Sequence, residues 1–240
     1  MDRLRCLDRQ YGNYCYQCNN DYDVLHHDLF KIPLQRVSRI NSIIFDLGGV
    51  LIDWNPNYVY HENYFSTIEE RNYFFENICT NDWNENQDAG YSIAKATAEK
   101  LKEFPEWEKP ILDFYGKWEE MLGGAIMETV EIFSLLKQNP PLKFYALTNW
   151  SAETFPIALK RFDFLQWFDG RVVSGEEKTR KPFPEFYQLL FDRYSVKTAE
   201  ALFIDDNLRN VTAGNKLGLK SIHFTSAEQL KKELEKYCLL

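Results

Sequence analysis

Residues 43–53 read Ile-Ile-Phe-Asp-Leu-Gly-Gly-Val-Leu-Ile-Asp, and this stretch decides the fold. The run from Ile43 to Phe45 is apolar and partly β-branched, which is typical of a buried strand. Asp46 follows at once, and Gly48 and Gly49 provide backbone that can approach a ligand closely. In an open parallel α/β sheet, ligands bind outside the carboxyl ends of the strands. A solvated carboxylate on a glycine-rich turn explains the stretch equally well, so the rest of the chain must decide.

After residue 125 the sequence alternates between strand and helix patterns. Apolar runs predict strands at 142–147, 170–173, 201–204 and 219–224, and apolar residues at helical spacing predict helices at 126–136, 186–194, 211–217 and from Thr225 onward. Thr148 to Ser151 are expected to start another helix, and 176–182 to form a charged loop. This order predicts an α/β fold with a doubly wound parallel sheet.

Residues 57–124 read as one helical insertion between the first strand and the remaining strands. Asn55-Pro56 is a helix-start signal, and Thr67 with Glu70 has the form of a capping box. Gly123-Gly124 closes the segment, and no strand pattern interrupts it. We therefore expect a core made of 39–56 and 125–240, with a helical domain at 57–124.

Composition and charge narrow the possible partners. The chain has 240 residues, 45% of them hydrophobic, which is enough for one large domain or a core with a smaller second one. Its net charge of -8 argues against nucleic-acid and anionic-membrane partners. No apolar run approaches the roughly 20 residues needed to span a bilayer. Five cysteines, no apparent secretory signal and no disulfide framework make the cytoplasm the expected location.

Residues 1–38 differ from the rest and are expected to form a poorly ordered extension. These residues show no sustained hydrophobic periodicity, and they include Cys15, Cys18 and the pair His26-His27. This pattern invites a zinc interpretation, but a structural zinc site needs four ligands and a second clear pair is missing. We therefore expect no zinc site here.

Polar residues follow three of the expected strands. Asp46, the pair Thr148-Asn149 and the pair Asp205-Asp206 lie at strand ends, and Lys181 lies in the loop after a fourth strand. Three carboxylates suit Mg²⁺, which prefers oxygen ligands. A hydroxyl and a lysine suit the anionic oxygens of a phosphate group. Each group alone has an ordinary explanation as a helix cap or a solvated charge, but four such groups at one sheet edge favour a phosphate-handling site.

Four motifs resemble those of the haloacid dehalogenase-like superfamily, in the same order. They are Asp46-Leu-Gly-Gly-Val, Leu147-Thr-Asn-Trp, Lys181-Pro and Phe203-Ile-Asp-Asp-Asn-Leu-Arg-Asn, and the likeness runs from about residue 40 to 236. The helical insertion lies where that superfamily carries its C1 cap. The chain most resembles small-molecule phosphatases of the superfamily, including the bacterial glucose-1-phosphate phosphatase type.

The resemblance implies a role for each of these residues. Asp46 would be the nucleophile that forms an aspartyl-phosphate, and Thr148 and Lys181 would bind the phosphoryl group with Asn149 beside it. Asp205, Asp206, a carboxylate oxygen of Asp46 and the backbone carbonyl of Gly48 would hold Mg²⁺. The substrate would be a small phosphomonoester, such as a sugar phosphate. The sequence does not distinguish a monomer from a homodimer, and we expect one of the two.

Gly48 is the one departure from the family pattern. Most phosphatases of the superfamily carry an aspartate there as general acid/base, and glycine has no proton to donate to a leaving group. General acid catalysis contributes about 10²–10⁴-fold, so slow turnover, a good leaving group or proton transfer through water is expected. Two other functions stay open, a metal-independent 2-haloacid dehalogenase and a catalytically weakened binding protein. Cap aromatics could line the site, although such residues more often form core.

Overall fold

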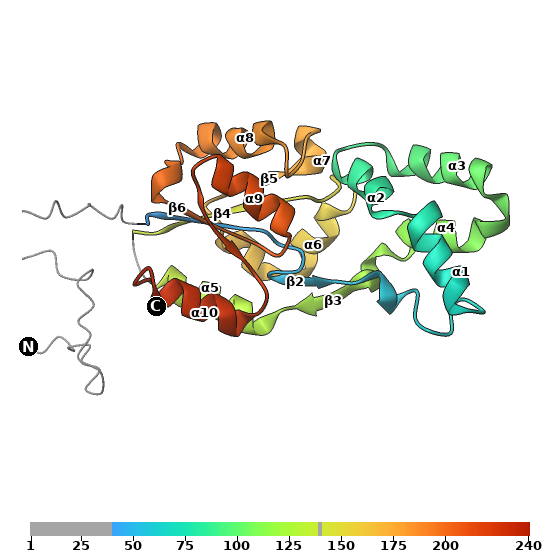
Figure 1. Cartoon of the computed structure of the whole chain (residues 1–240), viewed down its shortest axis with the longest axis horizontal. Coiled ribbons are helices and arrows are strands. Elements are labelled where there is room, and N and C mark those ends of the chain that lie inside the picture. Colours follow the sequence, from blue (N-terminus) through green and yellow to red (C-terminus); the bar gives the residue numbers. More distant parts are fainter. Residues whose placement is uncertain (1–39, 139–140) are drawn as a thin grey trace, which may run out of the picture.

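The computed structural model describes residues 40–138 and 141–240, and a parallel sheet forms its centre (Figure 1). Five strands lie in the order β5-β4-β1-β6-β7, and all neighbours are parallel. The strands are β1 (Ser42–Phe45), β4 (Lys143–Thr148), β5 (Gly170–Val173), β6 (Ala201–Asp205) and β7 (Lys220–His223). The predicted parallel α/β sheet is confirmed, and β1 occupies its middle.

Helices cover both faces of this sheet. One face packs against α5 (Met127–Lys137), α6 (Phe155–Arg161) and α10 (Ala227–Glu235), the other against α8 (Pro184–Tyr194) and α9 (Leu208–Lys216) (Figure 1). Alternation within β1 explains the two cores, because side chains of a strand point to opposite faces in turn. Ile43 and Phe45 join the first core and Ile44 joins the second, all fully buried. The doubly wound arrangement is therefore confirmed.

A second group of helices lies beside the sheet rather than on its faces (Figure 1). It consists of α1 (Ile68–Tyr73), α2 (Asn81–Asp88), α3 (Ile93–Glu103) and α4 (Glu108–Gly116). Thr67 caps α1 as predicted, because its hydroxyl accepts the Glu70 N–H. The buried Tyr60 ring packs against surrounding aromatic rings of this group, namely Tyr64, Phe65, Phe74, Phe75 and Phe114.

The tryptophans of this region are mainly core residues. The rings of Trp54 and Trp118 lie 5.3 Å apart, and Trp83 packs edge-on against Phe114. Tyr91 is exposed, and its hydroxyl donates to Glu99. These contacts account for the aromatic-rich sequence by packing, as aromatic pairs at 4.5–7 Å commonly do.

The prediction that no strand interrupts residues 57–124 was wrong. Strand β3 (Leu122–Ala125) pairs antiparallel with β2 (Ile52–Trp54), and this small sheet carries the chain out of the core and back. Two glycines weaken a strand signal in sequence. Their small size is required here, because a Cβ on Gly123 would lie 2.4 Å from the Asp53 carboxylate. Because β2 and β3 lie far apart in the sequence, no short stretch of sequence reveals that they pair.

Three local predictions also need correction. Helix α6 begins at Phe155 rather than at Thr148–Ser151, because Ser151 first accepts the Glu153 N–H in a separate turn. The expected charged loop at 176–182 begins inside a short helix, α7 (Ser174–Glu177). Helix α10 is capped by Ser226, whose hydroxyl accepts the Gln229 N–H, one residue later than the predicted cap at Thr225.

In residues 40–138 and 141–240, no helix combines the length and apolar character needed to cross a bilayer. The predicted extension at 1–38, with Cys15, Cys18, His26 and His27, lies outside the described residues.

Candidate active site

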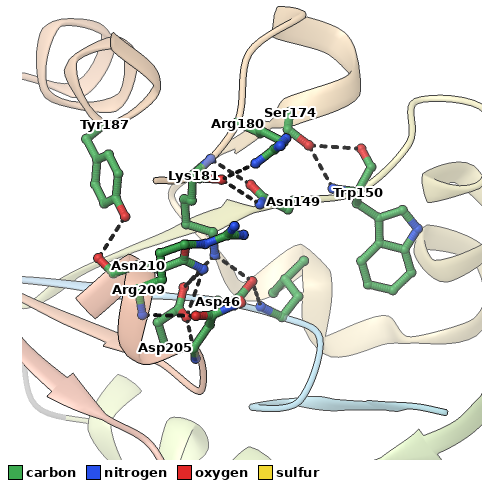
Figure 2. Close-up of polar contacts among 12 residues, drawn as sticks. Asp46, Asn149, Trp150, Ser174, Arg180, Lys181, Tyr187, Asp205, Arg209 and Asn210 are labelled. Atoms are coloured by element: carbon green, nitrogen blue, oxygen red, sulfur yellow. Dashed lines mark hydrogen bonds and ion pairs between the residues drawn. The ribbon is translucent and has the colours of Figure 1, made fainter. Parts of the chain in front are cut away.

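Asp46, Lys181 and Asp205 meet where β1 and β6 end (Figure 2). The Lys181 Nζ lies 3.0 Å from Asp46 Oδ1 and 2.7 Å from Asp205 Oδ2, and the side chains of Lys181 and Asp205 are fully buried. The register of β1 against β6 produces this meeting, because Phe45 pairs with Ile204 and the next residue of each strand is the aspartate. The sheet therefore brings together residues 159 positions apart in the chain (205 − 46).

Backbone contacts fix the position of Lys181. The Asn149 side-chain amide donates to the Lys181 carbonyl at 3.0 Å, and its oxygen accepts the Lys181 N–H at 2.8 Å. Arg180 also donates to this carbonyl through Nη1. Asn149, expected beside the phosphate group, thus uses both ends of its amide on the lysine loop (Figure 2).

Asp205 is held by α9 and the turn before it. The Asn210 amide donates to both carboxylate oxygens, at 3.1 and 3.2 Å, and the Asn207 N–H donates to Oδ1. Tyr187 on α8 donates its hydroxyl to the Asn210 carbonyl at 2.8 Å, which joins the second helix to the site (Figure 2). Such contacts fix a carboxylate in one orientation before any ligand arrives.

Thr148 offers a free hydroxyl at the end of β4. The residue is 1% exposed, and its Oγ1 has no hydrogen-bond partner among the residues that the structure describes. Buried polar atoms are nearly always paired, so this hydroxyl, at the end of a strand beside Asp46, is available to hydrogen-bond a ligand. The neighbouring strand β1 places Asp46 at the same edge.

The glycine turn after Asp46 serves two different purposes. Gly49 has φ +72°, and a Cβ there would lie 2.2 Å from Asp206 Oδ2, so only glycine lets this carboxylate approach. Gly48 has no such restriction, because a Cβ there would meet no atom of the described part of the chain within 4 Å. Position 48 therefore has room for a side chain, but the residue there is glycine, which has none.

Burial and mutual repulsion shape the charge of the carboxylates. Desolvation, together with repulsion from Asp205 and Asp206, raises the pKa of Asp46 to about 8 despite the attraction of Lys181. Desolvation and Asp205 also raise the pKa of Asp206. Burial alone would lower the pKa of Lys181, but Asp205 and Asp46 outweigh it and raise that pKa.

These side chains fit a divalent cation. Ligand atoms of Asp46, Asp205 and Asp206 all lie within 4.8 Å of one another. Lys181 contacts Asp46 and Asp205, and burial together with repulsion among the carboxylates raises the pKa of Asp46 and of Asp206. An all-oxygen set of this kind suits Mg²⁺, which retains water at its other positions.

We expect Mg²⁺ to stabilise the protein, and to do so more at pH 8 than at pH 5. Asp46 has a pKa of 3.8 when free and about 8 here, so in the absence of metal its ionisation lowers stability as pH rises between about 4 and 8. The cation binds the ionised form and removes that cost. At 100-fold excess over Kd the melting temperature should rise by roughly 5–10 °C, measured by thermal unfolding with Mg²⁺ and with chelator.

Asp206→Asn should lose most of this shift, whereas Asp192→Asn should keep it. Asp192 is an exposed aspartate on α8 that accepts a hydrogen bond from Gln188. Equal shifts in the two variants would contradict a metal site at Asp206.

The structure thus brings together most of the predicted site. Asp46, Lys181 and Asp205 are in direct contact, Asp206 lies beside them, and Thr148 ends the adjacent strand. Sequence reasoning missed the positioning role of Asn210 and the close approach of Asp206 to Gly49. The signal for Asn210 was present, because it is the third residue of α9, the helix that follows the acidic pair, and lies four positions after Asp206.

Comparisons with known proteins agree with this geometry. A family model described as haloacid dehalogenase-like hydrolase matches residues 40–218. The chain is 26% identical over 197 residues to drimenol cyclase drtB of Aspergillus calidoustus, covering 81% of this chain but only 36% of that relative's length. It is 27% identical over 202 residues to sesquiterpene phosphatase astK of Aspergillus oryzae, covering 78% of this chain and 90% of the relative.

A solved structure shares the fold. The HAD family enzyme bt-2542 of Bacteroides thetaiotaomicron, in complex with magnesium and inorganic phosphate, superposes with a TM-score of 0.56 at 21% identity. The match covers 78% of this chain and 95% of that one. At this identity the likeness concerns the arrangement of strands and helices.

Proposed function

The chain belongs to the haloacid dehalogenase-like hydrolase family, and we propose that it is a Mg²⁺-dependent phosphatase of small phosphorylated molecules, phosphomonoesters included. The contact of Asp46 with the buried Lys181, beside the orphan hydroxyl of Thr148, is the observation that carries the proposal. The phosphatase name of the Aspergillus oryzae relative, and the magnesium and phosphate of the Bacteroides structure, support the same chemistry.

In the proposed mechanism, Asp46 attacks the phosphorus atom and forms an aspartyl-phosphate that water then hydrolyses. Lys181 and the Thr148 hydroxyl bind the anionic oxygens of the phosphoryl group, and Asn149 holds the lysine loop in place. Asp205, Asp206, Asp46 and the Gly48 carbonyl would hold Mg²⁺. When bound, this ion supplies positive charge beside the phosphoryl oxygens.

We also propose that helices α1–α4 form a C1-type cap over this site. The domain boundaries would be 39–56 and 125–240 for the core and 57–124 for the cap, with the β2–β3 pair as the connection between them. The finer assignment to phosphatases of the bacterial glucose-1-phosphate phosphatase type belongs to the same proposal.

An aryl phosphate assay tests the function. We expect p-nitrophenyl phosphate to be hydrolysed with Mg²⁺ and the rate to fall to background with chelator, because the carboxylates repel the substrate when no cation compensates them. Adding Mg²⁺ in excess over the chelator should restore the rate.

Other assay results would favour one of the two alternative functions. Metal-independent halide release from a 2-haloacid would favour the dehalogenase, in which the same Asp46 attacks carbon. No turnover of any phosphate would favour a binding protein. The acidic pair Asp205-Asp206 favours the phosphatase, because attack on carbon needs no metal.

A further inference from the structure

Glu85 on α2 forms two ion pairs with residues of the core. Its Oε2 lies 2.8 Å from Arg180 Nη1, and its Oε1 binds Arg209. The Arg209 side chain is 46% exposed, and an ion pair so open to solvent contributes little. The side chains of Arg180 and Glu85 are only 15% and 19% exposed, and removal of one partner from a shielded pair leaves the other charge uncompensated. The position of Arg180 therefore depends on Glu85.

Arg180 connects this ion pair to the active site. It directly precedes Lys181 in the chain, and the same Nη1 that faces Glu85 donates to the Lys181 carbonyl at 3.2 Å (Figure 2). The Asn149 amide donates to this carbonyl as well, at 3.0 Å. Two donors thus fix one carbonyl, and a helix outside the core holds one of them in place.

The Lys181 side chain requires an accurately placed backbone. It is fully buried, and its Nζ lies 3.0 Å from Asp46 Oδ1 and 2.7 Å from Asp205 Oδ2. Both contacts depend on where the backbone of Lys181 lies. Misplacement of a catalytic group by about 1 Å can lower a rate by about 10²-fold. We therefore expect weaker support at the Lys181 carbonyl to be visible in turnover.

The end of α2 also contacts the loop that follows Thr148. Ser174, the first residue of α7, accepts the Trp150 N–H at 2.8 Å and donates its hydroxyl to the Asp88 carbonyl at 2.5 Å. Asp88 is the last residue of α2, which lies beside α7 in Figure 1. Trp150 lies two residues after Thr148. One helix therefore reaches both loops that would bind the phosphoryl group.

We propose that Glu85 is a positioning residue for catalysis, which holds Arg180 and thereby fixes the backbone of Lys181 when α2 is seated on the core. This inference rests on the proposed phosphatase function. Glu85 acts through Arg180 and not by contact with the substrate. Lys181 would bind the phosphoryl group that all substrates share, so loss of Glu85 should slow the hydrolysis of every phosphorylated substrate by the same factor.

The test compares kcat for p-nitrophenyl phosphate and for acetyl phosphate, whose leaving groups differ, well below the melting temperature of each variant. Glu85→Gln and Arg180→Gln should each lower kcat about tenfold for both substrates, as expected for loss of an interaction with a charged group. The double variant should fall no further, because both changes release the same carbonyl.

Asp113→Asn is the matched control. The Asp113 side chain is 17% exposed and, like Glu85, pairs with two cations, here Lys109 and Lys117. These pairs lie at α4 and do not connect it to the core. The control should lose two ion pairs and keep the wild-type kcat.

Three results would overturn the positioning role. A lower melting temperature with unchanged kcat in Glu85→Gln would show that this residue only fastens α2 to the core. A double variant whose loss equals the product of the two single losses would show that Glu85 and Arg180 act independently. Unequal losses for the two substrates would show an effect on the leaving group instead of the phosphoryl group.

Failure of the wild type to hydrolyse either substrate would overturn the phosphatase function, and hydrogen exchange then tests the positioning without turnover. The Lys181 N–H donates to Asn149 Oδ1 at 2.8 Å. In Glu85→Gln the peptide that contains this amide should exchange several-fold faster, followed by mass spectrometry, whereas Asp113→Asn should match the wild type. Equal exchange rates in all three proteins would contradict the positioning role.

Discussion

Asp46→Asn is expected to lower kcat by about 10⁴-fold or more, as removal of a nucleophile does in other covalent mechanisms. The amide has the same shape as the carboxylate and can still accept the Leu47 N–H, which lies 2.7 Å from Asp46 Oδ1. The amide is not a nucleophile, however, and cannot attack phosphorus. Initial rates with aryl phosphate and Mg²⁺ measure the effect.

The same substitution should stabilise the metal-free protein at pH 8. It removes a desolvated carboxyl group whose pKa is raised to about 8, so the melting temperature in chelator should rise and vary less between pH 5 and 8. Asp53→Asn is the matched control, because Asp53 lies on β2 and accepts the Tyr58 hydroxyl. A fully active Asp46→Asn would show that another residue is the nucleophile.

Gly48→Asp is expected to raise hydrolysis of alkyl phosphates about 10²-fold or more, the lower range for a general acid. A Cβ at this position meets no atom of residues 40–138 and 141–240 within 4 Å, and the φ angle of Gly48 is not in the left-handed region, so the fold should tolerate the change. Aryl phosphate should gain far less, because its leaving group is weakly basic and needs no proton. The ratio of kcat/KM values for a sugar phosphate and an aryl phosphate reports the difference.

Gly48→Asn is the matched control, equal in size but unable to donate a proton as an acid. If Asn and Asp give the same gain, the benefit comes from filling space and not from acid catalysis. If neither changes the ratio, protonation of the leaving group does not limit the reaction.

The core of the fold was predictable because each strand carried its own signal. Ile43 to Phe45 is buried on both faces, and a parallel strand of this kind reads as continuous apolar sequence. The site was predictable for the same reason, since Asp46 and Asp205 directly follow or end such strands. Their meeting then follows from parallel topology alone.

Contacts between distant segments left no signal in the sequence. Asp53 and Gly124 pair across 71 positions (124 − 53), and the two glycines of β3 read as a break. Glu85 meets Arg209 across 124 positions, and each looks like an ordinary surface charge in its own helix. Helix α6 was placed too early because Ser151 forms a local turn that resembles a helix cap.

Chemical trapping of the intermediate tests the central claim most directly. Wild-type protein is mixed with Mg²⁺ and aryl phosphate, quenched with acid during the first turnover and reduced with borohydride, which converts an aspartyl-phosphate into homoserine. Mass spectrometry of the peptides should then find the modification at Asp46 and nowhere else, and Asp46→Asn should show none. Phosphate release without modification of Asp46, or modification of another residue, would contradict the assignment of Asp46 as the nucleophile.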